Sequence, residues 1–168
     1  MAGSDGLDIT LFRALTLVAR QLTVAVEQRL QSEAGISLPE FEILSALAAA
    51  PDRRARAGEL GQMLVWEKSR ISHQVGRMER KGLIERFPCA DDLRGTWVGL
   101  TDAGSGVIAS ASPAYDTAIN AQLGAVAATD AGADLARDVL AIGTTVSPAA
   151  CQGEMEALLT TLDGATAG

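Results

Sequence analysis

The chain has 168 residues, 48% of them hydrophobic and 4% aromatic, with a formal net charge of −7, a length that suits one domain or a compact unit with an added dimerisation element. The sequence holds neither an uninterrupted apolar run of about 18 residues nor a basic-then-apolar N-terminus, so we expect neither a membrane span nor a secretion signal. Two cysteines, Cys89 and Cys151, are too few for a disulfide scaffold and favour a cytoplasmic protein with reduced thiols.

The first expected element is a long helix over residues 7–34. Apolar residues recur there at intervals of three and four, which is helical spacing: Leu11, Leu15, Val18, Leu22, Val26 and Leu30. Gly35 is placed to end the helix in the left-handed conformation. A helix of about 28 residues exceeds the usual globular length, so we expect part of it to pack against a partner chain. An ordinary core helix with a frayed start is the alternative.

A second helix is expected to start at Ser37 or Leu38, because Pro39 fits a first helical turn, and to end before Pro51. The charged stretch 52–56 is predicted to be a loop. A short third helix follows over residues 57–64, and a fourth covers roughly residues 67–82, which Gly82 is placed to close.

The spacing of apolar residues then changes from the helical period to the alternation of extended strands. Residues 83–87 and 96–100 are predicted to be two strands joined by the loop 88–95. Thr101 suits the N-cap of a helix over residues 101–127. The last helical region is expected to be divided at Gly143 and Pro148, and the tail 163–168 to be disordered.

Charge is distributed unevenly along this acidic chain. The segment from Arg53 to Trp97 holds ten lysine and arginine residues against six acidic ones, so it carries +4 and the remainder −11. A basic segment within an acidic protein indicates that one surface meets a polyanion. A solvated helix with Glu–Arg pairs is the alternative. For the cluster Arg53, Arg54 and Arg56, both phosphate contact and a solvated loop remain open.

The fourth helix has two distinct faces at 100° per residue. Ile71, Val75 and Met78 fall on a buried face together with Gly82. The opposite face and its flanks carry polar, cationic and small residues: Ser69, Arg70, Ser72, His73, Gly76, Arg77 and Arg80. Such side chains reach phosphates and base edges in DNA grooves, and a glycine allows close approach.

The order of elements predicts a winged helix-turn-helix: a short helix, a turn, an amphipathic helix with a polar front, and a hairpin. The second helix of such a unit enters the major groove, and the hairpin tip reaches the minor groove. Arg94 lies at that tip, where a narrow minor groove favours an inserted arginine. Asp92 is placed to hold its guanidinium group.

The stretch "GLIERFPCADDLRGTWVGLTDAG" resembles the wing signature of MarR-type regulators. Its matching positions are Gly82, Leu83, Asp92, Arg94, Val98, Leu100, Thr101 and Gly104. The preceding "ELGQMLVWEKSRISHQVGRMERKGL" is similar to the two-helix DNA reader of that family. The resemblance covers roughly residues 35–105. One departure is "VWEK", where family members commonly start the recognition helix with a small polar residue or proline.

The resemblance implies a mainly α protein: a winged helix-turn-helix with a two-stranded β wing, flanked by N- and C-terminal dimerisation helices. The implied domains are a dimerisation helix over 1–36, a DNA-binding domain over 37–104 and dimerisation helices over 105–168. The expected function is transcriptional repression by a homodimer on a pseudo-palindromic operator in double-stranded DNA, with release by a small-molecule effector. The DNA-binding residues so implied are Lys68, Ser69, Arg70, Ser72, His73, Arg77 and Arg94, with Asp92 supporting Arg94.

The same chain contains residues that bear on other classes of function. His73 has no partners at metal-ligand spacing, and no acid, base or nucleophile constellation is present, so we expect no enzyme, no metal and no cofactor. Cys89 beside Arg86 raises the alternative of a thiol-based redox sensor, although Asp91 and Asp92 would raise a thiol pKa. A winged-helix protein–protein module is the other alternative, which salt- and sequence-dependent DNA binding would distinguish.

Overall fold

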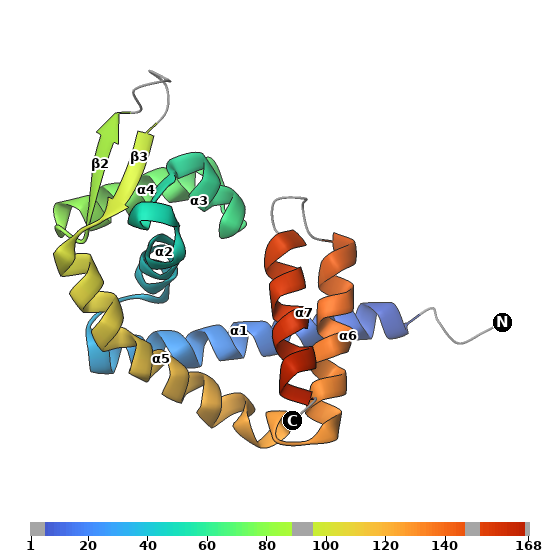
Figure 1. Cartoon of the computed structure of the whole chain (residues 1–168). Coiled ribbons are helices and arrows are strands. Elements are labelled where there is room, and N and C mark those ends of the chain that lie inside the picture. The colour runs from blue at the N-terminus through green and yellow to red at the C-terminus, as the bar shows by residue number, and fades with distance from the viewer. Residues whose placement is uncertain (1–5, 89–95, 147–151, 167–168) are drawn as a thin grey trace.

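A computed structural model of the chain describes residues 6–88, 96–146 and 152–166. The described part is mainly helical with one small antiparallel sheet, which confirms the expected fold class (Figure 1). In chain order the elements are α1 (Leu7–Ala34), α2 (Leu38–Ala49), the 3-10 helix η1 (Pro51–Arg53), β1 (Arg54–Arg56), α3 (Ala57–Met63), α4 (Lys68–Arg80), β2 (Ile84–Pro88), β3 (Thr96–Leu100), α5 (Asp102–Ala127), α6 (Asp130–Val146) and α7 (Gln152–Thr166).

The sheet has the strand order β1-β3-β2, with β3 antiparallel to both neighbours. Strands β2 and β3 are the predicted wing hairpin. The prediction of a loop over 52–56 was wrong for Arg54–Arg56, which pair with β3. Ala55 is buried opposite Val98, between two flanking arginines. Because only one residue of this strand is apolar, the alternation that marks a strand was too short to recognise.

The core is built around α2, which buries Phe41, Ile43, Leu44 and Leu47. A capping box starts this helix: Ser37 Oγ accepts from the Glu40 backbone N–H, and the Glu40 carboxylate accepts from the Ser37 N–H. Helix α3 adds the fully buried Leu60. The predicted N-cap of α5 is also confirmed, because the Thr101 hydroxyl accepts from the Gly104 N–H at 3.0 Å. Helix α4 packs against this core through three buried residues, Ile71, Val75 and Met78.

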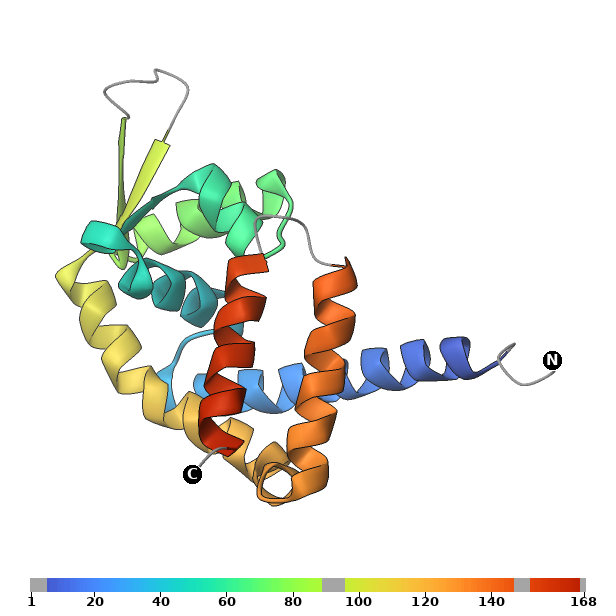
Figure 2. The ribbon, with the colours of Figure 1, turned by 45° about the vertical axis from the view of Figure 1, so that its right-hand side comes forward.

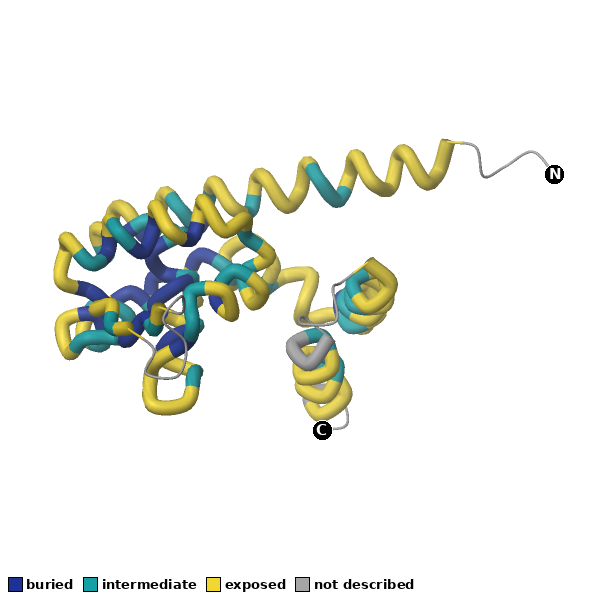
Figure 3. Tube along the Cα trace, turned by 90° about the horizontal axis from the view of Figure 1, so that it is seen from above, coloured by how far each residue is buried: buried dark blue, intermediate teal, exposed yellow. Residues whose placement is uncertain are grey.

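Helix α1 packs beside α5 but extends beyond the core (Figures 1 and 3). Its C-terminal half buries Val26 and Leu30, whereas Leu11 is 46% exposed, Phe12 70% and Val18 51%. By length and composition α1 could also cross a membrane. Soluble core helices and signal sequences share those properties, so they do not place α1 in a bilayer. Most apolar side chains of the N-terminal half are nevertheless exposed within the described chain, and Leu15 is half-buried.

The C-terminal helices α6 and α7 lie side by side as a hairpin (Figures 1 and 2). The expected division at Gly143 was wrong, because α6 continues to Val146. The Cβ of a residue at position 143 would lie 3.0 Å from Met155 Sδ, so glycine permits the close approach of α7. The tail was expected to be disordered, but α7 continues through residues 163–166. Pro148 lies outside the described residues.

Candidate nucleic-acid interface

The turn between α3 and α4 sets the direction of the candidate recognition helix. Val65 adopts a positive φ of 52°, and the Trp66 N–H donates to Gly61 O at 2.8 Å. Helix α4 then begins at Lys68 and ends at Arg80. Its predicted inner face is confirmed for Ile71, Val75 and Met78, which are all buried. The prediction was wrong for Gly82, which is exposed, because α4 ends at Arg80 and the chain turns there with a Gly82 φ of 71°.

The outer face of α4 gathers the residues that the sequence assigned to DNA. Six of them are exposed along this one helix: Lys68, Ser69, Arg70, Ser72, His73 and Arg77. Gly76 lies among them, and a Cβ built there would meet no atom within 4 Å in the described chain. The structure therefore brings a row of hydroxyl, imidazole and cationic groups onto one open helix surface.

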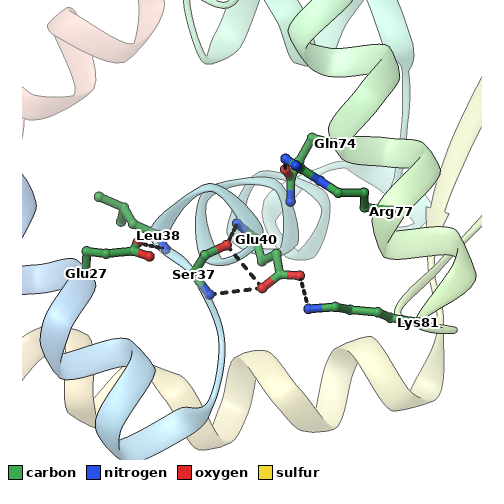
Figure 4. Close-up of polar contacts among 7 residues, drawn as sticks. All are labelled: Glu27, Ser37, Leu38, Glu40, Gln74, Arg77 and Lys81. Atoms are coloured by element: carbon green, nitrogen blue, oxygen red, sulfur yellow. Dashed lines mark hydrogen bonds and ion pairs between the residues drawn. The ribbon is translucent and has the colours of Figure 1, made fainter.

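Two of these side chains reach back toward the body of the protein. The guanidinium carbon of Arg70 lies 3.7 Å from the Trp66 ring centroid, a cation–π contact that half-buries the tryptophan under the start of α4. The Arg77 guanidinium donates to Gln74 Oε1 (Figure 4). Gln74 is only 3% exposed, and the helical wheel did not single it out. Arg70 and Arg77 thus lie at the border between the outer face and a cleft.

That cleft has a volume of about 840 Å³ and is lined by α1, the N-terminus of α2, and α4. Its walls mix acidic and basic side chains, including Glu27, Glu42, Arg70 and Arg77. Burial raises the pKa of Glu42, with Arg70 opposing and Glu27 adding to that shift. A ligand here would lie against the side chains that border the outer face of α4.

A second cleft, of about 940 Å³, lies between α2, α3 and α5. The rings of Phe41 and Tyr115 stack beside it with centroids 4.4 Å apart. The first cleft adjoins α4 and the second adjoins α3, so both lie beside the helix-turn-helix unit. The sequence could not separate their lining residues from the core.

The base of the wing is joined to α4 by an ion pair. Arg86 on β2 donates from Nε and Nη2 to the same oxygen of Glu79. On β3, the Trp97 ring lies 5.3 Å from the guanidinium carbon of Arg54 and 5.4 Å from that of Arg56. Arg53 donates to Ser105 Oγ at 3.3 Å. The arginines of the 53–56 cluster therefore have protein contacts, and Trp97 is partly exposed beneath two of them.

Several predicted positions cannot be placed in this geometry. Cys89, Asp92 and Arg94 lie outside the described residues. Across the residues that are described, no group of three or more His, Cys, Asp or Glu side chains is arranged to hold a metal ion. Sequence reasoning also missed the Glu40–Lys81 ion pair between α2 and α4, because its partners are 41 residues apart.

Known proteins resemble this chain in sequence and in fold. The MarR family model matches residues 34–95. The transcriptional regulator HosA of Escherichia coli O127:H6 (strain E2348/69 / EPEC) is 31% identical over 93 residues, which cover 55% of this chain and 67% of HosA. Sco3205 from Streptomyces coelicolor, a MarR family transcriptional regulator solved in complex with DNA, has a TM-score of 0.78 at 26% identity, covering 88% of this chain and 96% of Sco3205. AbsC, another MarR family regulator from Streptomyces coelicolor, has a TM-score of 0.76 at 26% identity, covering 87% of this chain and 98% of AbsC.

Proposed function

The chain belongs to the MarR family of transcriptional regulators, and we propose that it represses transcription in the cytoplasm by binding a pseudo-palindromic operator as a homodimer. The observation that carries the proposal is the outer face of α4, with its six exposed polar and cationic residues around Gly76. The structural neighbour Sco3205 was solved with DNA, which supports the same use of this fold.

In the proposed complex α4 lies in the major groove. Arg70 and Arg77 supply guanidinium groups that suit guanine edges or phosphates, while the hydroxyls and His73 reach either. Lys68 at the start of the helix suits a phosphate. From the family resemblance, Arg94 enters the minor groove from the wing, held by Asp92. Phosphate contacts supply affinity and base contacts supply sequence preference.

The uncovered apolar surface supports the homodimer. Exposed large apolar side chains lie on the N-terminal half of α1, on the end of α5 and on α6: Leu7, Ile9, Leu11, Phe12, Leu17, Val18, Leu123, Val126, Leu135, Val139 and Ile142. Burying such a surface against a second copy is favourable at about 25 cal/mol per Å². Two-fold symmetry then sets the half-sites about one helical turn, or roughly 34 Å, apart.

We expect the purified protein to have about twice the chain mass of 17.4 kDa in solution. Leu11→Glu places a charge on the uncovered half of α1 and should shift the species toward the monomer, because an unpaired charge in an apolar interface is costly. Sedimentation velocity measures the mass of the wild type and of the Leu11→Glu variant. A wild-type monomer at micromolar concentration would contradict the dimer.

Release by a small-molecule effector completes the proposal. A ligand in the cleft between α1, α2 and α4 would lie against Arg70 and Arg77. If it binds more tightly to an arrangement that misfits DNA, it lowers operator affinity by population shift.

Redox control through Cys89 stays a separate hypothesis. Peroxide treatment with mass mapping tests it, and peroxide-induced DNA release from protein whose Cys89 is unmodified would reject it.

Substitutions on α4 should separate base reading from general attraction. Arg77→Ala or His73→Ala is expected to reduce discrimination between the operator and scrambled DNA by about 1–3 kcal/mol. Arg94→Ala should weaken operator binding by a similar amount if the wing enters the groove. Arg137→Ala on α6 is the matched control, expected to leave discrimination unchanged. Fluorescence anisotropy on the operator and scrambled duplexes measures these affinities. An operator-to-scrambled affinity ratio that is equal for wild type and Arg77→Ala would show that Arg77 does not read bases.

A further inference from the structure

Glu40 is a buried carboxylate whose oxygens are both engaged. Its side chain belongs to a residue that is 4% exposed. One oxygen accepts from the Ser37 N–H at 2.9 Å and the Ser37 hydroxyl at 3.1 Å, and the other accepts from Lys81 Nζ at 2.5 Å (Figure 4). Burial raises the pKa of Glu40, but the hydrogen bonds from Lys81 and Ser37 outweigh it, so the pKa is lowered overall. The carboxylate is therefore held in its charged form.

The pair connects two helix ends whose dipoles favour it. Glu40 lies in the first turn of α2, and Lys81 occupies the C-cap position of α4. An anion at a helix N-terminus and a cation at a C-terminus are each stabilised by the helix dipole. Immediately after Lys81, Gly82 takes a φ of 71° and turns the chain toward β2. The ion pair thus fixes the end of α4 at the point where the chain reverses.

The same corner of α2 is also attached to α1. Glu27 on α1 accepts from the Leu38 N–H at 2.5 Å, at the first residue of α2 (Figure 4). Two carboxylates therefore join α1 to α2 and α2 to α4, along the wall of the cleft that all three helices line. The proposed dimerisation helix and the proposed recognition helix are thus linked through the first turn of α2, in which Leu38 is half-buried and Glu40 is buried.

We propose that Glu40 is a positioning residue for DNA recognition: through Lys81 it fixes the angle at which α4 is presented to the major groove. The inference rests on the proposed DNA-binding function and goes beyond it, because Glu40 is buried and acts through Lys81. A recognition helix must hold several side chains at base edges simultaneously, so a small change in its angle lowers specific binding more than non-specific attraction to phosphates.

Glu40→Gln is the deciding variant, because loss of the charge and loss of helix positioning change operator affinity in opposite directions. The substitution removes one negative charge, so electrostatics alone predict slightly tighter binding to every duplex. A positioning role predicts weaker operator binding, by roughly tenfold, with unchanged or slightly higher affinity for scrambled DNA. Glu85→Gln on β2 makes the same charge change at an exposed position and should not weaken operator binding.

Stability is separated from positioning by two further variants. Ser37→Ala removes the hydroxyl that caps α2 but leaves the Glu40–Lys81 pair, so it should lower the unfolding midpoint and keep the operator-to-scrambled affinity ratio. Lys81→Arg keeps the ion pair and should keep the ratio, whereas Lys81→Gln should lower it. All affinities are measured at a temperature where circular dichroism shows each variant folded, with the operator duplex selected from random DNA.

A lower ratio in Glu40→Gln and Lys81→Gln, with Lys81→Arg and Ser37→Ala near wild type, supports the positioning role. Operator binding by Glu40→Gln that equals or exceeds wild type overturns it while leaving the proposed function intact. Failure of the wild type itself to distinguish operator from scrambled DNA overturns both.

Discussion

Gly104→Ala is expected to destabilise the folded chain by about 3 kcal/mol or more, or to prevent folding. A Cβ at this position would lie 2.0 Å from the Leu83 carbonyl oxygen and 2.8 Å from Leu100 Cδ1. The helix start cannot move away easily, because the Gly104 N–H is held by the Thr101 hydroxyl, which itself donates to Gly82 O at 2.8 Å. The clash therefore falls on the backbone that joins α4, the wing and α5. Urea denaturation followed by circular dichroism measures the loss.

Gly106→Ala is the matched control two residues along the same helix. A Cβ at that position would meet no atom within 4 Å in the described part of the chain. Alanine is the better helix former, so this change should stabilise α5 by about 0.5–1 kcal/mol. Similar urea midpoints of unfolding for Gly104→Ala and Gly106→Ala would show that Gly104 does not pack against Leu83 as described.

Gly76→Glu is expected to abolish operator binding while leaving the fold intact. The position is open within the described structure, so the side chain fits the free protein, and glutamate favours a helix more than glycine does. In the groove the same side chain would clash with DNA and bring a carboxylate to the phosphates. Like charges brought together cost several kcal/mol, so we expect a loss of roughly 100-fold or more.

Companion variants separate size from charge at position 76. Gly76→Gln has nearly the same volume without the carboxylate, and Gly76→Ala adds only a methyl group. We expect operator affinity to fall in the order Ala, Gln, Glu while the thermal midpoints stay at or above wild type. Wild-type affinity for a folded Gly76→Glu protein would mean that this face of α4 does not meet DNA.

Local patterns predicted much of this fold. The apolar spacing of α4 identified Ile71, Val75 and Met78 as its buried face, and Thr101 marked the start of α5. Such features depend on neighbours within a turn or two of helix, which a single sequence displays directly. The resemblance then related α4 and the hairpin to a DNA reader before any contact was visible.

Features that depend on distant residues were not predicted. Strand β1 exists because Ala55 meets Val98, and the Glu40–Lys81 pair joins residues 41 positions apart. Gln74 lies at the edge of the apolar stripe, where a wheel cannot tell burial from exposure. Gly104 belonged to the family signature, but the reason that it must be glycine is the carbonyl of Leu83 across the fold. Tertiary packing, rather than local propensity, decides each of these.

Sequence-specific DNA recognition is tested most directly by selecting bound duplexes from random DNA with the purified protein near physiological salt. We expect the wild type to enrich an inverted repeat with half-sites about one helical turn apart, and Gly76→Glu to enrich no motif. Binding to the selected duplex should weaken steeply with added salt. A folded, dimeric wild-type protein that enriches no motif would contradict sequence-specific DNA recognition and favour a protein partner for the basic face of α4.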